Sequence, residues 1–283
     1  MLQRLVVVGA TGYLGGRIMA EARAIVPSVG TSSRDPGMLR LDLDRPEEFD
    51  YAQLGTGDVV MLCGGITDPD ACAREHARAW ALNVEGTIAF MERALRRGAR
   101  VVFFSSDTVY GERDADFDEA AACRPAGAYA TMKGAVERHF AGHAQVRTLR
   151  LSYVFSGADK FTRYLQDCLD RGEEAAVFQP FERAIVHRDD VVAAALGLAQ
   201  RWQEVPGYAI NIGGPEIVSR IEFAEMLKNA VMPRLRYRKV DPGPEFFHNR
   251  PRVIRMRSPL LASLLRRPAR ALREAIRLEF RPG

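Results

Sequence analysis

The sequence predicts an α/β protein in which a doubly wound parallel sheet carries a smaller C-terminal α/β lobe. Two patterns predict this class. A continuous apolar run at 5–8 leads into a glycine-rich segment at 9–15 and then into a helical stretch that reaches about residue 25. Short apolar runs then alternate with helical stretches through the first half of the chain, as parallel strands joined by helices do. The 283 residues, 47% of them hydrophobic, are enough to bury a substantial core.

The glycine-rich segment has the spacing of a dinucleotide-binding turn. Gly9 would allow a tight turn after the strand, Gly12 would let the backbone approach a pyrophosphate, and Gly15 would let the helix pack close to the strand. The free N–H groups at the start of the helix would then face the phosphates. The sheet is therefore expected to be of the Rossmann type. The cofactor-binding residues expected here are Gly9, Thr11, Gly12, Tyr13, Leu14 and Gly15.

The remaining elements are predicted from the same alternation. Further strands are expected at 29–33, 58–63, 100–105, 147–151 and 208–212. Helices are expected at 70–97, 129–140 and 191–202. We therefore expect a dinucleotide-binding domain over 1–155, to which 185–212 returns, and a mainly substrate-binding lobe over 156–283. Ligands of such sheets bind outside the carboxyl ends of the strands. Glycines and small polar residues stand at these ends: Gly9, Ser33, Cys63-Gly64-Gly65, Ser105-Ser106 and Ser152.

Tyr129 and Lys133 stand four residues apart on a predicted helix, so their side chains share a face one turn apart. A phenol normally has a pKa of about 10, and a nearby ammonium lowers that pKa by favouring phenolate. Ser106, at the end of the strand at 100–105, would hold a substrate oxygen in line with the phenol. Together with the glycine turn, these residues indicate hydride transfer at an alcohol or ketone carbon beside a nicotinamide ring.

Five segments, in order along the chain, resemble the extended short-chain dehydrogenase/reductases of the NAD-dependent epimerase/dehydratase branch, and most of all the dTDP-4-dehydrorhamnose reductases. The segments are Gly9–Gly15, Ala81–Thr87, Phe104–Gly111, Tyr129–Lys133 and Ile185–Asp190. The resemblance implies that Ser106 is the catalytic hydroxyl and Tyr129 the acid/base. It implies that Lys133 binds the nicotinamide ribose and tunes the tyrosine.

The resemblance also implies further cofactor contacts. These are Asn83, the strand end Cys63, Gly64 and Gly65, and the pair Asp42 and Leu43 beside the adenine. The second strand ends in Thr31-Ser32-Ser33-Arg34, without the acid that would bind a ribose 2′-hydroxyl. Ser33 and Arg34 suit a 2′-phosphate instead, so NADP is the preferred cofactor, with NAD as the alternative. In that alternative Arg34 simply faces solvent.

The residue after Ser106 separates the reactions of this family. It is Asp107, followed by Thr108 where a 4,6-dehydratase would carry a glutamate base, and the loop at 156–160 lacks the histidine of GDP-fucose synthases. The resemblance thus implies reduction of the 4-keto group of a nucleoside-diphosphate sugar. Asp107 would lie beside the sugar hydroxyls, and Arg183 and Arg250 would bind the diphosphate. Two alternatives remain: a nucleotide-sugar 4-epimerase with tightly bound NAD, and a non-catalytic NADP-binding regulatory subunit.

Composition narrows the class of partner. The net charge is +4, and basic residues outnumber acids after residue 234, but proline and aliphatic residues interrupt them. This favours an anionic small molecule over a nucleic acid. The apolar runs are far too short for a bilayer and the start lacks signal-like features, so no membrane and a cytoplasmic location are expected. The four cysteines show no metal-ligand spacing, so no metal is expected. A homodimer is expected through helices around 71–97 and 125–142.

Overall fold

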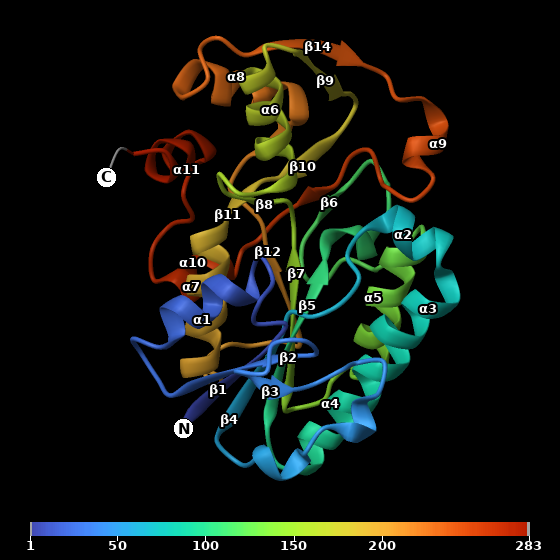
Figure 1. Ribbon diagram of the computed structural model, residues 1–283, viewed down its shortest axis with the longest axis vertical. Coiled ribbons are helices and arrows are strands. Elements are labelled where there is room, and N and C mark those ends of the chain that lie inside the picture. Colours follow the sequence, from blue (N-terminus) through green and yellow to red (C-terminus); the bar gives the residue numbers. More distant parts are fainter. Residues whose placement is uncertain (1, 282–283) are drawn as a thin grey trace.

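The computed structural model describes residues 2–281 and confirms the predicted α/β fold (Figure 1). Seven strands form one sheet in the order β12-β7-β5-β4-β1-β2-β3, and every neighbouring pair is parallel. Their bounds are β1 (Arg4–Val8), β2 (Ser28–Ser32), β3 (Leu39–Arg40), β4 (Asp58–Leu62), β5 (Arg100–Ser106), β7 (Val146–Leu151) and β12 (Ala209–Ile212). The five further strands expected from the sequence are β2, β4, β5, β7 and β12, each shifted by at most one residue at an end.

Helices cover both faces of this sheet (Figure 1). One face carries α1 (Gly15–Ala22), α7 (Arg188–Gln200) and α10 (Leu261–Leu265). The other carries α4 (Thr87–Arg96) and α5 (Ala128–His139). Along β1, Val7 packs into the first layer and Val6 into the second, and both are fully buried. Burial on both faces explains why the strands read as continuous apolar runs in the sequence.

The long helix expected at 70–97 is broken into four pieces: α2 (Pro69–Arg74), α3 (His76–Trp80), a π-helical segment η3 (Ala81–Gly86) and α4. The first break lies at Glu75, whose backbone leaves the helical region. At the last junction a Cβ on Gly86 would lie 1.8 Å from the carbonyl oxygen of Leu43, so only glycine lets the two segments touch. The π-helical segment contains Asn83, and such segments often mark functional sites.

A second body of structure lies above the carboxyl ends of the strands, at the top of Figure 1. Its helices are α6 (Lys160–Arg171), α8 (Arg220–Ala230), α9 (Gly243–Phe247) and α11 (Leu272–Glu279). Its strands form pairs: β9 (Glu174–Phe178) with β14 (Arg236–Val240), and β10 (Glu182–Ala184) with β13 (Ile217–Ser219). Two short pairs lie nearer the sheet: β8 (Val154–Phe155) with β11 (Val186–His187), and β6 (Asp116–Phe117) with β15 (Arg255–Met256). Three 3-10 segments complete the chain: η1 (Pro46–Glu48), η2 (Tyr51–Gln53) and η4 (Asp107–Tyr110). We call the part formed by α6, α8, α9, α11 and their strands the upper lobe.

The surface bears on two further expectations. Within residues 2–281, no helix combines the length and the apolar character that crossing a bilayer requires. The large hydrophobic side chains exposed among the described residues are Tyr13, Ile25 and Tyr164, and none of them lies on α3, α4 or α5. The homodimer expected through those helices therefore stays a prediction.

Candidate active site

The end of β5 forms the floor of the site. Ser106 caps η4, because its hydroxyl oxygen accepts hydrogen bonds from the backbone N–H of Thr108 at 3.2 Å and from the hydroxyl of Thr108 at 3.0 Å. The same Ser106 hydroxyl lies 3.3 Å from Oδ1 of Asp107 and donates to it. A strand that stops at a serine and turns at once into a helical segment thus holds this hydroxyl at the carboxyl edge of the sheet.

Helix α5 holds Tyr129 and Lys133 one turn apart, as their spacing predicts. The Lys133 ammonium is almost completely buried and donates a 2.8 Å hydrogen bond to the carbonyl oxygen of Phe104 on β5. It also lies 4.7 Å from the ring centroid of Phe103 and 5.8 Å from that of Tyr129. The lysine therefore joins the helix to the strand that ends in Ser106.

The pKa of Tyr129 shifts in the direction opposite to the one expected from the sequence. Burial raises the pKa of Tyr129, and the charges of Asp107 and Cys72 raise it further. Burial lowers the pKa of Lys133 to about 8, although the nearby cysteines and Glu137 oppose this. The spacing suggested that the ammonium would lower the pKa of the phenol. Here the ammonium hydrogen bonds to Phe104 instead, so the buried phenol keeps its proton at neutral pH.

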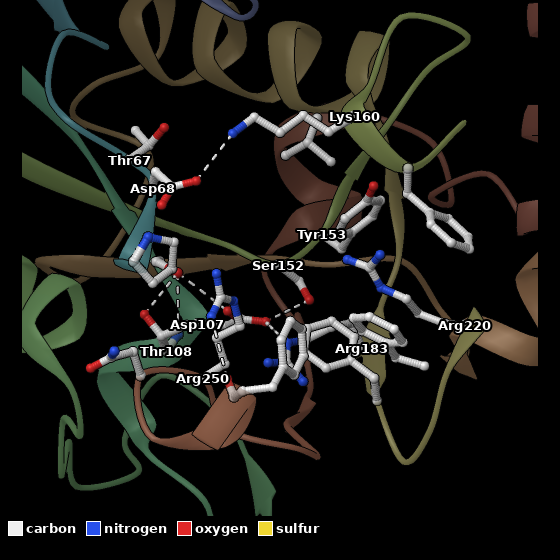
Figure 2. Close-up of a pocket in the computed structure, with 18 of the residues that line it drawn as sticks. Thr67, Asp68, Asp107, Thr108, Ser152, Tyr153, Lys160, Arg183, Arg220 and Arg250 are labelled. Atoms are coloured by element: carbon white, nitrogen blue, oxygen red, sulfur yellow. Dashed lines mark hydrogen bonds and ion pairs between the residues drawn. The ribbon is translucent and has the colours of Figure 1, made fainter. Parts of the chain in front are cut away.

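A cavity of about 690 Å³ lies between the carboxyl ends of the strands and the upper lobe (Figure 2). Ser106, Asp107, Thr108 and Ser152 line it from the sheet. Aromatic side chains line it from the upper lobe and from the end of β7: Tyr153, Phe161, Tyr164, Phe178, Phe181 and Phe246. Neither Tyr129 nor Lys133 belongs to this lining. Tyr129 is nevertheless close enough to Asp107 for the charge of that carboxylate to raise the pKa of the phenol. Cavities of this size and character hold small organic ligands.

Asp107 is a buried acid in the floor of the cavity. Its Oδ2 accepts a 2.8 Å hydrogen bond from the hydroxyl of Ser152 and lies 3.6 Å from Nε of Arg183. Burial raises the pKa of Asp107, although the charge of Arg183 and the hydrogen bonds from Ser152 and Ser106 oppose this. Burial likewise lowers the pKa of Arg183, which the charge of Asp107 opposes. The two residues share one buried environment.

The two arginines expected to bind a diphosphate both line this cavity. Arg183 also donates to three backbone carbonyl oxygens: those of Glu182 at 2.7 Å, Arg252 at 3.0 Å and Pro251 at 2.6 Å. Arg250 forms two hydrogen bonds, of 2.7 and 2.6 Å, with the carboxylate of Asp70 on α2. A second ion pair across the cavity joins Lys160 to Asp68 at 3.5 Å. Both ion pairs connect the upper lobe to the segment that follows β4.

The glycine turn packs closely against helix α1 and the segment after β4 at the expected cofactor edge. Gly9 has a φ of +77°, and a Cβ on Gly15 would lie 2.2 Å from the carbonyl oxygen of Gly9, so the turn and helix α1 meet with no room for a side chain. A Cβ on Gly9 would in turn lie 2.9 Å from the Cα of Gly64. Asn83 accepts from the N–H of Ile66 and donates to its carbonyl oxygen, both at 2.8 Å, which fixes the loop after Gly65. Such close backbone approach fits a pyrophosphate-binding edge.

The other residues expected at this edge are spread along it. Ser33 and Arg34 are exposed just after β2, and the hydroxyl of Ser32 accepts from the N–H of Arg34 at 3.1 Å. The carboxylate of Asp42 accepts from the N–H of Asp44, and the N–H of Cys63 donates to the carbonyl oxygen of Val8. Tyr13, in the glycine turn, donates a 2.8 Å hydrogen bond to the hydroxyl of Ser156. Leu43 packs in the apolar layer on the α4 side of the sheet, and Thr11 and Leu14 lie in the turn itself.

One cavity residue, Arg220, is not singled out by any functional motif in the sequence. It is the first residue of α8, after the N-cap Ser219, and its guanidinium lies against the rings of Tyr153, Phe161 and Phe181. A serine followed three residues later by glutamate signals a helix start. That signal locates Arg220 in the chain but says nothing about where its side chain points.

For metals, residues 2–281 contain no cluster of three or more His, Cys, Asp or Glu suited to a metal ion.

The chain is similar to one protein family and to several proteins of known activity. The family model described as RmlD substrate binding domain matches residues 3–278. A dTDP-4-dehydrorhamnose reductase from Mycobacterium tuberculosis is 30% identical over 165 residues, which cover 55% of this chain and 51% of the relative. One from Sinorhizobium fredii is 26% identical over 212 residues, which cover 70% of this chain and 67% of the relative. The match to the mycobacterial protein thus spans about half of that protein's length.

Solved structures share the fold over almost the whole chain. MoeE5 in complex with UDP-glucuronic acid and NAD has a TM-score of 0.80 and 25% identity, covering 96% of each chain. The RMD protein of Pseudomonas aeruginosa complexed with NADPH has a TM-score of 0.78 and 20% identity, covering 97% of this chain and 96% of that one. A UDP-glucuronic acid 4-epimerase mutant from Bacillus cereus has a TM-score of 0.83 and 18% identity, covering 98% of each.

Proposed function

The chain belongs to the RmlD substrate binding domain family, and on this premise we propose that it is an NAD(P)-dependent oxidoreductase that reduces the 4-keto group of a nucleoside-diphosphate sugar. One observation carries the proposal. Ser106 lines a cavity of about 690 Å³, and Tyr129, held on α5 beside Lys133, lies close enough to feel the charge of Asp107 in the same lining. The hydroxyl thus lines the cavity, and the phenol and the ammonium lie on α5, outside the lining.

Reduction of a ketone requires a hydride at carbon and a proton at oxygen. In this proposal Tyr129 donates the proton to the carbonyl oxygen, because the phenol is protonated at neutral pH. The Ser106 hydroxyl donates a hydrogen bond to the same oxygen. Lys133, joined to the carbonyl oxygen of Phe104, would hold the nicotinamide ribose. NADPH, when bound, would supply the hydride.

NADP is the proposed cofactor, with NAD as the alternative. The close packing of Gly9, Gly15 and Gly64 fits the approach of a dinucleotide pyrophosphate. At the end of β2, exposed Ser33 and Arg34 follow without an acid at positions 31–34, which favours a 2′-phosphate. Among the solved relatives, the RMD protein holds NADPH and MoeE5 holds NAD.

The proposed substrate is a nucleotide sugar, seated in the cavity with its sugar near Ser106 and Asp107. Asp107 would accept hydrogen bonds from sugar hydroxyls, and Arg183 and Arg250 would lie along the diphosphate. The relatives support this class of substrate, since two are dTDP-4-dehydrorhamnose reductases and MoeE5 binds UDP-glucuronic acid.

Three further assignments belong to the proposal. Residues 1–155, which contribute six of the seven strands of the sheet, form the dinucleotide-binding domain with 185–212, and 156–283 mainly bind substrate. The enzyme acts in the cytoplasm and as a homodimer. It needs no nucleic acid, membrane or metal.

The experiment is a turnover assay with NADPH and a panel of nucleoside-diphosphate 4-keto sugars. Consumption of NADPH with one of them, and release of its 4-hydroxy product, is the expected result. A 4-epimerase is the second candidate, because MoeE5, with a TM-score of 0.80, binds NAD together with a UDP-sugar. It would purify with NAD and interconvert 4-hydroxy sugars with no net consumption of cofactor. A regulatory subunit would bind NADPH and consume none with any sugar.

A further inference from the structure

Four basic side chains line the cavity: Lys160, Arg183, Arg220 and Arg250. Three of them have an acidic partner, since Lys160 pairs with Asp68, Arg183 with Asp107 and Arg250 with Asp70. Arg220 has none: its guanidinium makes no hydrogen bond and no ion pair with any residue in the described range 2–281. Figure 2 accordingly shows it beside Tyr153 without a dashed line.

Local structure holds this free cation in place. Arg220 follows directly on β13, and its backbone N–H donates to the carbonyl oxygen of Phe181 at 2.9 Å. Ser219 and Glu222 form a capping box that fixes the first turn of α8. The guanidinium carbon lies 4.5 Å from the ring centroid of Phe161, 4.6 Å from that of Phe181 and 5.4 Å from that of Tyr153. Three rings therefore set the direction of the side chain into the cavity.

The buried environment disfavours the positive charge of Arg220, although three aromatic rings pack against its guanidinium. Burial lowers the pKa of Arg220, which Tyr153 and the charge of Asp159 oppose, and the charge of Arg250 lowers it further. Arg183 lies against the same ring of Phe181, at 4.4 Å, so two cations share it. Asp159 has a charge that reaches Arg220, but its carboxylate is occupied by Tyr153, Phe161 and Thr162, which donate to it. An apolar side chain would pack here without repulsion, so the charge itself requires an explanation.

We propose that Arg220 binds an oxyanion of the substrate with its planar fork of N–H donors. The inference rests on the proposed function, because the cavity is the one assigned to the nucleotide sugar. A guanidinium binds a phosphate or a carboxylate through two parallel hydrogen bonds. The oxyanion is either the diphosphate linkage or a carboxylate carried by the sugar. The N–H donors of Arg220 are free, so the ligand would supply their hydrogen-bond acceptor. Arg183 and Arg250 already have partners within the protein.

The test compares Arg220→Met with the wild type by calorimetry, with NADP present at saturation. Thymidine, thymidine diphosphate and two nucleoside-diphosphate sugars, one neutral and one a uronate, are titrated. If the diphosphate is the oxyanion, the variant binds thymidine diphosphate roughly 10- to 100-fold more weakly and thymidine equally well. If a sugar carboxylate is the oxyanion, only the uronate loses affinity by this factor. Unchanged affinity for every ligand would overturn the proposal.

Arg252→Met is the matched control. Arg252 also stacks on an aromatic ring, that of Phe247 at 4.5 Å, but it is outside the cavity lining and pairs with Glu112 on the surface. It should bind all ligands as the wild type does. Melting curves establish that each variant is folded. If Arg220→Met fails to fold, Arg220→Lys takes its place, because it keeps the charge and loses the fork, and a loss of at least threefold is expected.

A failure of the proposed function is recognised separately. If the wild type binds no nucleotide ligand, the nucleotide-sugar assignment fails, and inorganic pyrophosphate becomes the probe. Stabilisation of the NADP-saturated wild type by pyrophosphate, absent in Arg220→Met and retained in Arg252→Met, would keep Arg220 as an oxyanion site. No stabilisation of the wild type by pyrophosphate would overturn the inference as well.

Discussion

Glu137 and Arg150 form a buried ion pair that joins the active-site helix to the sheet. Glu137 lies one turn after Lys133 on α5, and Arg150 lies on β7. Nε and Nη2 of Arg150 donate to Oε2 of Glu137 at 3.0 and 2.6 Å, and Nη1 donates to the hydroxyl of Tyr110 at 2.9 Å. Both side chains are less than a tenth exposed. Burial by itself lowers the pKa of Arg150, but the hydrogen bonds and charge of Glu137 more than offset this and raise it.

Replacing Glu137 by Gln leaves the arginine charge buried without a counter-charge. Removing one member of such a pair costs about 3–5 kcal/mol of unfolding free energy. For a chain of this size about 2 °C of melting temperature corresponds to each kcal/mol, so we expect a fall of roughly 6–10 °C. The paired replacement of Glu137 by Leu and Arg150 by Met removes both charges, so it should restore stability to near the wild-type value or above it.

Urea unfolding followed by circular dichroism, with calorimetry for the melting temperature, measures these differences. Asp114→Asn is the control, because Asp114 forms an equally short ion pair with Arg255 but is 94% exposed. Exposed pairs contribute about 0–1 kcal/mol, so this variant should unfold almost like the wild type. The reasoning would be refuted if Glu137→Gln lost less than about 1 kcal/mol, or if the double variant were as unstable as the single one.

Three further outcomes are expected. Tyr129→Phe should lower turnover by about 10²–10⁴-fold in the reductase assay, with unchanged melting temperature and NADPH affinity; wild-type rates would remove Tyr129 as the acid. Arg34→Ala should weaken NADPH at least tenfold more than NADH in fluorescence titrations, whereas equal losses would exclude a 2′-phosphate contact. Lys133→Met should be inactive yet more stable at neutral pH, by up to about 3 kcal/mol, since burial lowers the pKa of Lys133 to about 8. Above that pH the folded lysine loses its proton before the unfolded one does, so wild-type stability should rise relative to the variant up to about pH 10, and a pH-independent difference would contradict this.

The strands and the helix that carries Tyr129 and Lys133 were the predictable part of the molecule, because each depends on local sequence. Gly9, Gly12 and Gly15 stand between a buried strand and a helix, and backbone geometry permits few other arrangements there. Tyr129 and Lys133 share a helix face whatever surrounds them. Their placement beside β5 then follows from the order of the elements along the chain.

The contacts between segments distant in the sequence were not predictable in this way. The spacing of apolar residues at 70–97 indicates one helix, but the tight contact between Gly86 and Leu43 and the backbone break at Glu75 come from tertiary packing. Similarly, a motif can mark Arg183, but only the fold brings the carbonyl oxygens of Pro251 and Arg252 to its donors. The capping box marks the position of Arg220 in the chain, but three rings from other elements set the direction of its side chain.

The two ion pairs that connect the upper lobe to the segment after β4 make this part of the cavity wall sensitive to ionic strength. Lys160–Asp68 and Arg250–Asp70 both include partly exposed groups, so dissolved salt competes with them. The screening length falls from about 10 Å in 0.1 M salt to about 3 Å in 1 M salt, comparable to the distance between the paired atoms. Concentrated salt would therefore weaken both ion pairs together. An anionic ligand would therefore leave the cavity fastest in concentrated salt, where the attraction that captures it is also weakest.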